Sequence, residues 1–393
     1  MDASFFIARR LRFKGNIAVV SIAVSFLVMI IAVSVSSGFR KEIRAGLSML
    51  TGDVRIMPPT MNVLDGNSPV DTDAAYMPYL TGYDAVDAVY PVIYRAGIVK
   101  NGTDIHGVVF KGVSEDHADM PSDSVSLPVS IPSRLAAKSG LVPGDRMLTY
   151  FVGEDVKVRQ FNVVSIYDEL VETDDNMMVM ASMADLQRIN GWDDNQASCL
   201  EVHLDASCRN VANLSEISDE IGFMINAYSS DDDENVISLS SADSYPQLFD
   251  WLELIDFNVF FILILMTIVA GFNMISGLLI MLFENISTIG LLKSLGMKDW
   301  AISKVFLSSS AVLVLKGMAA GNLIAVLFCL IQNTTHVLRL DPENYFVPFV
   351  PVHLDFASIL AADIISFAAI MLLLLIPCMF ISKVDPAETV RVR

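Results

Sequence analysis

The stretch Phe272-Asn273-Met274-Ile275-Ser276 is followed, ending at position 297, by Ile289-Gly290-Leu291-Leu292-Lys293-Ser294-Leu295-Gly296-Met297. The first segment lies late in an apolar run from Leu254 to Phe283. The second is short and mildly basic, and another apolar run follows it. A helix placed between two membrane-spanning runs predicts a surface that contacts another molecule on the cytoplasmic side.

Four apolar runs are long enough to cross a bilayer, which takes about 20 residues. They are Ile17–Ser36, Leu254–Phe283, Ala301–Ile331 and Asp355–Ser382. Hydrophobic residues make up 53% of the chain, yet the chain also carries 45 acidic residues. Both facts agree if membrane spans and an acidic soluble domain share one chain.

Basic residues near the ends of the spans predict their orientation, because cytoplasmic loops carry an excess of Lys and Arg. Basic residues cluster before the first span, in the Glu284–Lys304 loop and in the C-terminal tail, whereas the Gln332–Leu354 loop has only Arg339. Both termini and the middle loop are therefore expected in the cytoplasm, and Phe39–Glu253 outside. The first span resembles a signal peptide, but its apolar run is longer than the roughly 7–15 residues of such peptides, so we expect it to be retained.

The segment Phe39–Glu253 holds 35 acidic and 14 basic residues. This excludes nucleic acid as a partner, because phosphate contacts need Lys and Arg. An acidic surface either keeps the domain soluble or meets a basic partner. The run Asp231-Asp232-Asp233-Glu234 lacks the spacing of a calcium loop and is interpreted as a solvated tip.

The same segment mixes strand and helix patterns without the strict alternation of a parallel sheet, which predicts an α+β domain. Helices are expected at Ala74–Val86 and Arg209–Ile225. Strands are expected at Asp53–Met57, Gly107–Gly112, Arg146–Val152, Lys157–Ile166, Met177–Met180 and Cys199–Leu204.

Residue patterns typical of catalysis are missing from the sequence. It has no Gly-x-x-x-x-Gly-Lys phosphate loop and no Gly-x-Ser-x-Gly nucleophile elbow, and its five histidines lack metal-ligand spacing. We predict no catalytic, cofactor or metal site on this chain. Cys199 and Cys208 are either bonded to each other or, more simply, Cys199 is an inert buried thiol.

Several segments together resemble the FtsX-like permease family of ABC transporters. FNMISGLLIML followed by IGLLKSLG is similar to the lipoprotein-releasing (Lol-type) permeases in particular. Weaker resemblances are carried by Pro132–Asp145 and Phe161–Tyr167 in the outer segment, by Tyr245–Leu252, by Leu340–Val352 and by Asp385–Arg391. The resemblance therefore touches most of the chain.

The resemblance implies an α-helical membrane protein with four transmembrane helices and a large α+β extracytoplasmic domain inserted between helices 1 and 2. In chain order, the expected parts are an N-terminal interfacial segment (1–15), transmembrane helix 1 (16–38), the periplasmic domain (39–253, with a β-rich insert at about 95–204), transmembrane helix 2 (254–283), a cytoplasmic coupling helix (284–300), transmembrane helix 3 (301–331), a periplasmic loop (332–354), transmembrane helix 4 (355–382) and a cytoplasmic tail (383–393).

In function, the resemblance implies a permease subunit in the bacterial inner membrane that extracts lipoproteins and hands them to a periplasmic carrier. The implied partners are membrane lipid, a second permease chain (identical or homologous) and an ABC ATPase dimer, which would bind ATP and Mg. One alternative is a mechanotransmission permease that exports a small molecule or activates a periplasmic hydrolase. Another is a membrane-anchored receptor without an ATPase.

The resemblance also implies sites. The residues expected to contact the ATPase are Glu284, Ile286, Ile289, Gly290, Leu292, Lys293, Leu295 and Gly296. Where the family has Arg-Glu or a similar pair before Ile-Gly, this chain has Ser287-Thr288. A projecting hairpin at Tyr167–Asn176 is expected either to contact the carrier or simply to face solvent. Its acidic residues are Asp168, Glu169, Glu172, Asp174 and Asp175.

Two charges lie centrally within spans, Lys316 in the third and Asp363 in the fourth. Charges inside the membrane are costly and are usually paired or functional. Counted along the helices at about 1.5 Å per residue, the two side chains come within reach of each other. We therefore expect an ion pair, with a lysine in a wet cavity as the alternative.

Overall fold

The computed structural model describes residues 16–64, 68–102, 104–114, 126–153, 155–169, 177–205, 211–230, 233–341 and 345–379. The predicted interfacial segment at 1–15 and the tail at 383–393 lie outside these residues. The chain divides into two compact units. We call Met1–Lys41, Trp251–Arg339 and Phe349–Arg393 the membrane unit, and Glu42–Asp250 with Leu340–Pro348 the outer unit.

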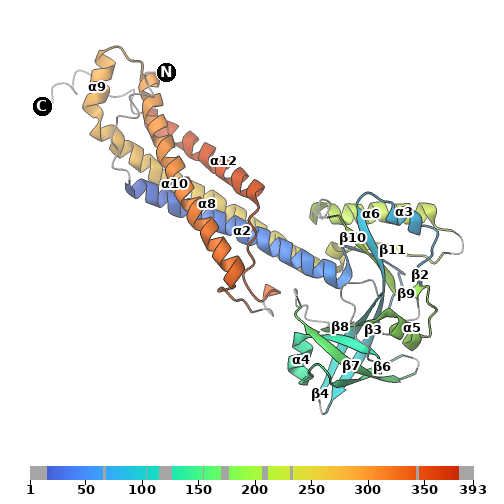
Figure 1. Cartoon of the computed structure of the whole chain (residues 1–393). Coiled ribbons are helices and arrows are strands. Elements are labelled where there is room, and N and C mark those ends of the chain that lie inside the picture. Colours follow the sequence, from blue (N-terminus) through green and yellow to red (C-terminus); the bar gives the residue numbers. More distant parts are fainter. Residues whose placement is uncertain are drawn as a thin grey trace. The chain divides into compact units, whose positions relative to one another are not determined.

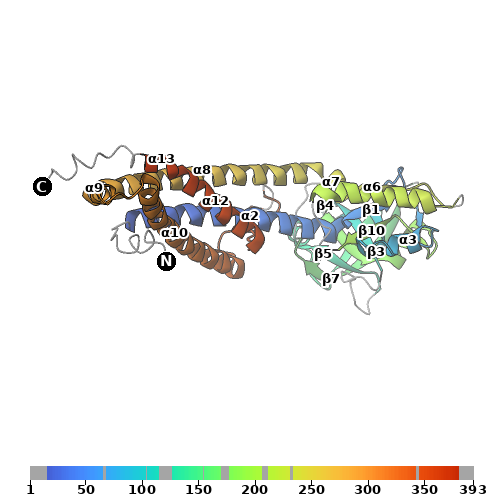
Figure 2. The same ribbon diagram turned by 90° about the horizontal axis from the view of Figure 1, so that it is seen from above.

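The membrane unit is built from long helices (Figures 1 and 2). They are α2 (Asn16–Thr51), α8 (Pro246–Glu284), α10 (Asp299–Thr335) and α12 (Phe356–Leu373), with the short α9 (Ile286–Ser294) and α13 (Leu375–Cys378) beside them. Four stretches are long and apolar enough to span a membrane, namely Ile17–Thr51, Pro246–Glu284, Asp299–Thr335 and Phe356–Cys378.

The first two long helices exceed what a bilayer needs. Helix α2 has 36 residues and α8 has 39, whereas a span takes about 20. Each helix runs on without a break beyond the predicted span ends at positions 38 and 254, into the sequence of the outer unit. Within the membrane unit, Arg40 and Ser36 of α2 both bind the carboxylate of Asp256 on α8.

Small residues allow α10 to pack tightly on α2, as the Gly317/Gly321 spacing indicates. A Cβ on Gly321 would lie 2.4 Å from the carbonyl oxygen of Ala23, and one on Gly317 would lie 2.7 Å from Ile22. The backbones approach each other at a distance that only glycine permits. Phe26 of α2 and Val314 of α10 are both fully buried at this contact.

The outer unit is built on a nine-stranded sheet of order β11-β1-β10-β3-β4-β8-β5-β7-β6. The strands are β1 (Val54–Met57), β3 (Val86–Asn101), β4 (Asp104–Val113), β5 (Pro128–Pro132), β6 (Arg146–Phe151), β7 (Lys157–Tyr167), β8 (Met177–Ser182), β10 (Cys199–Leu204) and β11 (Ile237–Ser240). Two further strands, β2 (Val70–Asp71) and β9 (Gln196–Ala197), pair with each other. The helices of this unit are α3 (Met77–Thr81), α4 (Ser133–Ser139), α5 (Met183–Asn190), α6 (Val211–Tyr228) and α7 (Ser241–Ser244).

Strand β6 also pairs with β3, from Ile98↔Tyr150 to Lys100↔Leu148. The pairing therefore returns to its start, and β3, β4, β8, β5, β7 and β6 close into a ring. The ring is filled by apolar side chains, among them the fully buried Phe110, Phe151 and Phe161. The Phe110 ring lies 5.1 Å from that of Phe151 and 4.9 Å from that of Phe161.

Two predictions about this unit can be compared directly with elements that the structure describes. The insert boundary expected at about Arg95 lies in β3, near the point where pairing with β10, which ends at Val92, gives way to pairing with β4, which begins at Ile93. The helix expected at Ala74–Val86 is only the five residues Met77–Thr81, because Pro78 opens it and Gly82 closes it. The segment between Tyr167 and Met177 does not join neighbouring strands, because β5 lies between β7 and β8 and pairs with both. From residue 170 onward, the hairpin expected at Tyr167–Asn176 lies outside the described residues.

Candidate functional site

Helix α9 lies between α8 and α10, where the sequence predicts a cytoplasmic helix. It ends as expected at Gly296, which adopts a left-handed φ of 83° that suits glycine. The amide of Gly296 donates to the carbonyl of Lys293 at 2.9 Å, and that of Met297 to Leu292 at 3.0 Å. These bonds satisfy carbonyls that a helix end leaves without partners.

Some of the residues expected to contact the ATPase pack against the chain itself. Ile289 is 1% exposed and belongs to the core that α2, α8 and α10 share, and Leu292 packs partly against the same core. Gly290 is buried beside Ile289. The protein's own helices therefore cover Ile289 fully and Leu292 in part, so neither residue belongs to a face that is open to a partner.

The rest of α9 leaves a different apolar surface uncovered. Leu295 is 75% exposed, Leu291 is 55% exposed and Ile286 is 38% exposed. Phe283 at the end of α8 and Trp300 at the start of α10 are 69% and 70% exposed. We call these five residues the α9 surface. Glu284, Ser287 and Thr288 lie exposed among them.

The sequence pattern did not single out Leu291 or Trp300. The sequence pointed to Leu292 instead, although the helical steps from Ser287 and Thr288 to Leu291, and from Leu291 to Leu295, mark the exposed face.

Lys293 has a partner within the chain. Its ammonium lies 3.0 Å from the carboxylate of Asp299, and its side chain is only 11% exposed. Asp299 is in the first turn of α10 and Lys293 in the last turn of α9, so each charge also suits its helix end. The pair holds the turn between the two helices, which makes Lys293 a poor candidate for contact with another subunit.

The predicted pair inside the membrane unit is not formed in this chain. Asp363 on α12 is buried, and its Oδ2 accepts a hydrogen bond from Asn322 on α10 at 2.5 Å. Lys316 is exposed on α10 instead. The expectation failed because height along a helix does not fix which side of the helix a residue occupies.

The acids expected to contact a carrier are only partly described. Asp168 is exposed just after β7, and Glu169 is half-buried beside it. Glu172, Asp174 and Asp175 lie outside the described residues, as do Asp231 and Asp232. Cys199 is a buried free thiol, in agreement with the simpler of the two interpretations. Cys208 falls in an undescribed stretch.

An apolar groove of about 580 Å³ lies between α8 and α12. Its polar lining atoms include the hydroxyls of Thr267 and Ser366, which bond each other at 3.1 Å. The other lining residues include Phe260, Ile264 and Leu373. The groove therefore suits hydrocarbon.

Comparison with known proteins supports the sequence resemblance. Residues 260–386 match the family described as FtsX-like permease C-terminal. The matched range contains most of α8 and all of α9, α10 and α12.

Relatives extend the match over nearly the whole chain. The lipoprotein-releasing system transmembrane protein LolC of Neisseria meningitidis serogroup B is 24% identical and aligns with 96% of this chain and 94% of its own length. LolC of Xylella fastidiosa strain Temecula1 is 20% identical over the same shares of both chains. The predicted resemblance to FtsX-like, Lol-type permeases is therefore confirmed.

Two solved structures were also found. The extracellular domain of the ABC-type transporter YknZ from Gram-positive bacteria covers 48% of this chain and 99% of its own, with a TM-score of 0.30. The periplasmic region of MacB from Actinobacillus actinomycetemcomitans covers 50% and 92%, with a TM-score of 0.31. Both are 12% identical to this chain. Scores this low support no further conclusion about the outer unit.

Proposed function

We propose that this chain is the permease subunit of an ABC transporter in the bacterial inner membrane, which extracts lipoproteins and passes them to a periplasmic carrier. The main support is the end-to-end alignment with chains named LolC, which covers 96% of this chain. The groove between α8 and α12 is compatible with a substrate that carries acyl chains.

In this proposal a separate ATPase dimer binds ATP and Mg and supplies the energy, and this chain is not catalytic. A second permease chain, identical or homologous, completes the membrane part. The exposed apolar faces of α8 suit such a neighbour, since Phe257, Phe260 and Phe261 are each about 60% exposed. Lipid is the other occupant of these faces.

The α9 surface is where the ATPase binds in this proposal. It carries large apolar side chains on a segment that the charge pattern places in the cytoplasm. Apolar area exposed there is stabilised when another protein covers it, at about 25 cal/mol per Å². The proposed carrier contact remains the acidic stretch that begins with Asp168 and Glu169 directly after β7.

The experiment is affinity purification of the tagged full-length chain from its native membranes. An ABC ATPase is expected to co-purify with the wild type. Leu295→Asp is expected to lower its yield at least about tenfold, because a carboxylate would have to be desolvated in the interface. Leu295 is exposed, so insertion and expression should be unchanged. Leu292→Asp would be a poorer test, because Leu292 packs on the chain's own core.

A matched control is Ile105→Asp in the outer unit, which places the same charge on an apolar residue that is 63% exposed. It should leave the ATPase bound. Undiminished ATPase recovery with Leu295→Asp would remove α9 from the interface. Absence of any ABC ATPase from the wild-type preparation would favour the receptor alternative. An ATPase without lipoprotein or acyl lipid in the mass spectrum would favour the mechanotransmission alternative.

A further inference from the structure

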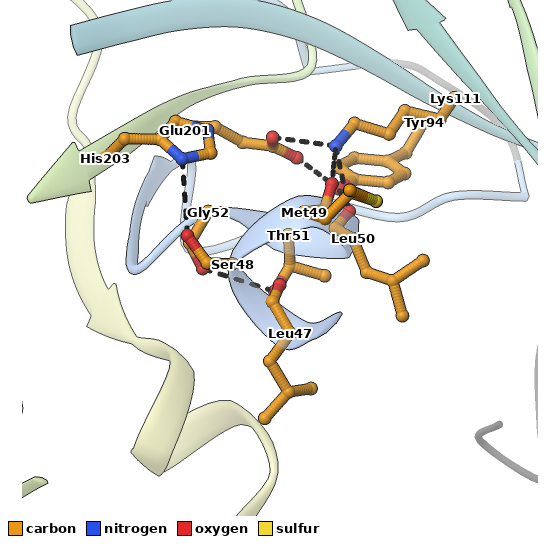
Figure 3. A network of polar contacts seen from close by, with 10 residues as sticks. All are labelled: Leu47, Ser48, Met49, Leu50, Thr51, Gly52, Tyr94, Lys111, Glu201 and His203. Atoms are coloured by element: carbon orange, nitrogen blue, oxygen red, sulfur yellow. Dashed lines mark hydrogen bonds and ion pairs between the residues drawn. The ribbon is translucent and has the colours of Figure 1, made fainter. Parts of the chain in front are cut away.

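Helix α2 ends in a buried network of charged and polar side chains (Figure 3). Lys111 of β4 and Glu201 of β10 form an ion pair of 2.8 Å, and both side chains are 0% exposed. The same ammonium donates to the carbonyl oxygens of Met49 and Leu50 at 3.0 and 2.9 Å. One lysine therefore uses all three of its donors, two of them on the last turn of α2.

This arrangement matches what a helix end requires. The last four carbonyls of a helix have no partner within it, and they carry partial negative charge. The hydroxyl of Tyr94, on β3, lies 2.9 Å from the carbonyl oxygen of Leu50 and also hydrogen-bonds Glu201. Burial, reinforced by Glu201, raises the pKa of Tyr94 well above 10, so the phenol stays a donor.

The connection from α2 to the sheet is short, and hydrogen bonds hold both of its residues. Only Gly52 and Asp53 separate the helix from β1. Gly52 has a φ of 71° and donates to the carbonyl of Ser48 at 2.9 Å. The amide of Asp53 donates to Val202 at 3.0 Å, and its carboxylate accepts from the amide of Leu204 at 2.9 Å. A Cβ on Gly52 would meet that of Glu201 at 3.0 Å.

We propose that Lys111, Glu201 and Tyr94 form a rigid joint that holds the last turn of α2 fixed on the sheet of the outer unit. The observations that carry it are the fully buried ion pair, its two bonds to helix carbonyls and a link of two residues that are both hydrogen-bonded. The role of this joint in transport rests on the proposed function, in which ATP hydrolysis moves the membrane helices. In that setting, the joint makes the end of α2 and the sheet of the outer unit move as one body.

The competing explanation is that the ion pair only stabilises the fold of the outer unit. A pair of substitutions can separate this explanation from a rigid joint. A buried ion pair often contributes no more stability than apolar residues of similar volume. The variant Lys111→Met with Glu201→Gln removes both charges and leaves neither unpaired, while Tyr94 can still donate to the amide oxygen that replaces the carboxylate. It should fold, but it loses the two bonds from the ammonium to the end of α2.

Hydrogen exchange of the full-length chain, measured by mass spectrometry in lipid nanodiscs, tests the joint directly. In the double variant, the amides of residues 48–53 should exchange at least about tenfold faster, because local opening no longer breaks those bonds. The amides of α6 in the same unit should be unchanged. Lys138→Met on the exposed side of α4 is the control and should change neither region. Unchanged exchange at 48–53, or an equal rise throughout the outer unit, would overturn the proposal.

The transport arm uses vesicles that contain the chain and its co-purified ATPase, with release of a palmitate-labelled lipoprotein as the readout. The double variant should hydrolyse ATP at the wild-type rate and release several-fold less lipoprotein per ATP. Equal release per ATP from a variant with a loosened joint would overturn the inference and leave the proposed function intact. If the wild-type chain binds no ATPase, the proposed function fails, and the exchange result still decides whether the joint is rigid.

Discussion

Two buried carboxylates, one in each unit, are satisfied to different degrees. Glu201 in the outer unit has both oxygens bonded, one to Lys111 and one to Tyr94. Asp363 in the membrane unit has one oxygen bonded to Asn322, and its other oxygen has no partner among the residues that the structure describes. Lys316, the nearest candidate cation in the sequence of α10, is exposed instead.

The difference teaches what each site does. A buried network whose polar groups all have partners fixes one geometry. Such a network suits a helix end that has to stay in place on the sheet. A half-satisfied carboxyl group in low dielectric is costly to keep. Such a group contributes little to the fold of its own unit, so its removal should be tolerated far better than the removal of Glu201.

The largest effect is expected from breaking the outer pair. Glu201→Gln leaves the Lys111 ammonium buried without an anion and should lower the free energy of unfolding by about 3–5 kcal/mol. Adding Lys111→Met should recover at least half of the loss. Thermal unfolding of the detergent-solubilised chain, followed by tryptophan fluorescence, measures both. Equal losses in the single and double variants would mean that the two side chains are not coupled.

A smaller effect is expected when Asp363 loses its one partner. Asn322→Ala should cost about 1–3 kcal/mol, the usual range for leaving a buried polar group unsatisfied. Lys316→Ala is the matched change on the same helix and should cost less, because Lys316 does not contact Asp363. A double-mutant cycle between Lys316 and Asp363 should then be additive. A coupling energy above about 0.5 kcal/mol in that cycle would restore the ion pair that the sequence predicted.

Alkaline pH should weaken the packing around the outer network, whereas neutral pH should leave it intact. Burial, and then the charge of Glu201, raise the pKa of the Cys199 thiol from 9.0 to about 12. A folded-state pKa above the unfolded value means that the stability is fully present below pH 9 and is lost as pH rises toward 12. The loss is at most about 1.4 kcal/mol per pH unit for one group. Tyr94 acts in the same direction. Unfolding temperatures of the wild type and Cys199→Ala, compared from pH 8 to 11, should show the steeper fall in the wild type, and parallel curves would exclude Cys199 as a contributor.

The smallest effect is expected at Asp363 itself. Asp363→Asn keeps the shape of the side chain and an acceptor for the Asn322 amide, so the free energy of unfolding should change by less than about 1 kcal/mol. The same unfolding assay measures it. A loss as large as that of Glu201→Gln would show that the free oxygen has a partner that matters, and the contrast between the two carboxylates would disappear.

How far the sequence predicts this molecule depends on the range of the interaction. The spans follow from composition alone, and strands such as β1 and β7 follow from local alternation. The closure of the ring through Ile98↔Tyr150 joins residues 52 positions apart, and Lys111 and Glu201 are 90 apart. Neither pairing produces a periodic pattern in the sequence near its residues, so neither could be predicted from local sequence. A clue did exist, since Lys111 follows the apolar run Val108–Phe110 and Glu201 lies between Leu200 and Val202.

The candidate site shows the same limit within a single helix. The position of α9 and its end at Gly296 could be predicted, because a short apolar run and a glycine are local features. Which face of α9 is covered depends on where α2, α8 and α10 lie, and no pattern within α9 contains that information. Ile289 and Leu292 therefore seemed equivalent to Leu295 in sequence, whereas the structure buries the first two at least in part and leaves Leu295 exposed.

The network at the end of α2 also decides where the protein can be cut. A soluble fragment that began at Gly52 would look natural, because it would start at the first strand and discard every apolar span residue. It would also remove the carbonyls of Met49 and Leu50, and the Lys111 ammonium would keep one acceptor in place of three. A fragment that starts near Glu42, where the outer unit begins, keeps the last turns of α2 and with them the carbonyl acceptors of the buried Lys111. The membrane helix thus contributes its final ten residues to the domain outside the bilayer, and that domain ends inside the helix.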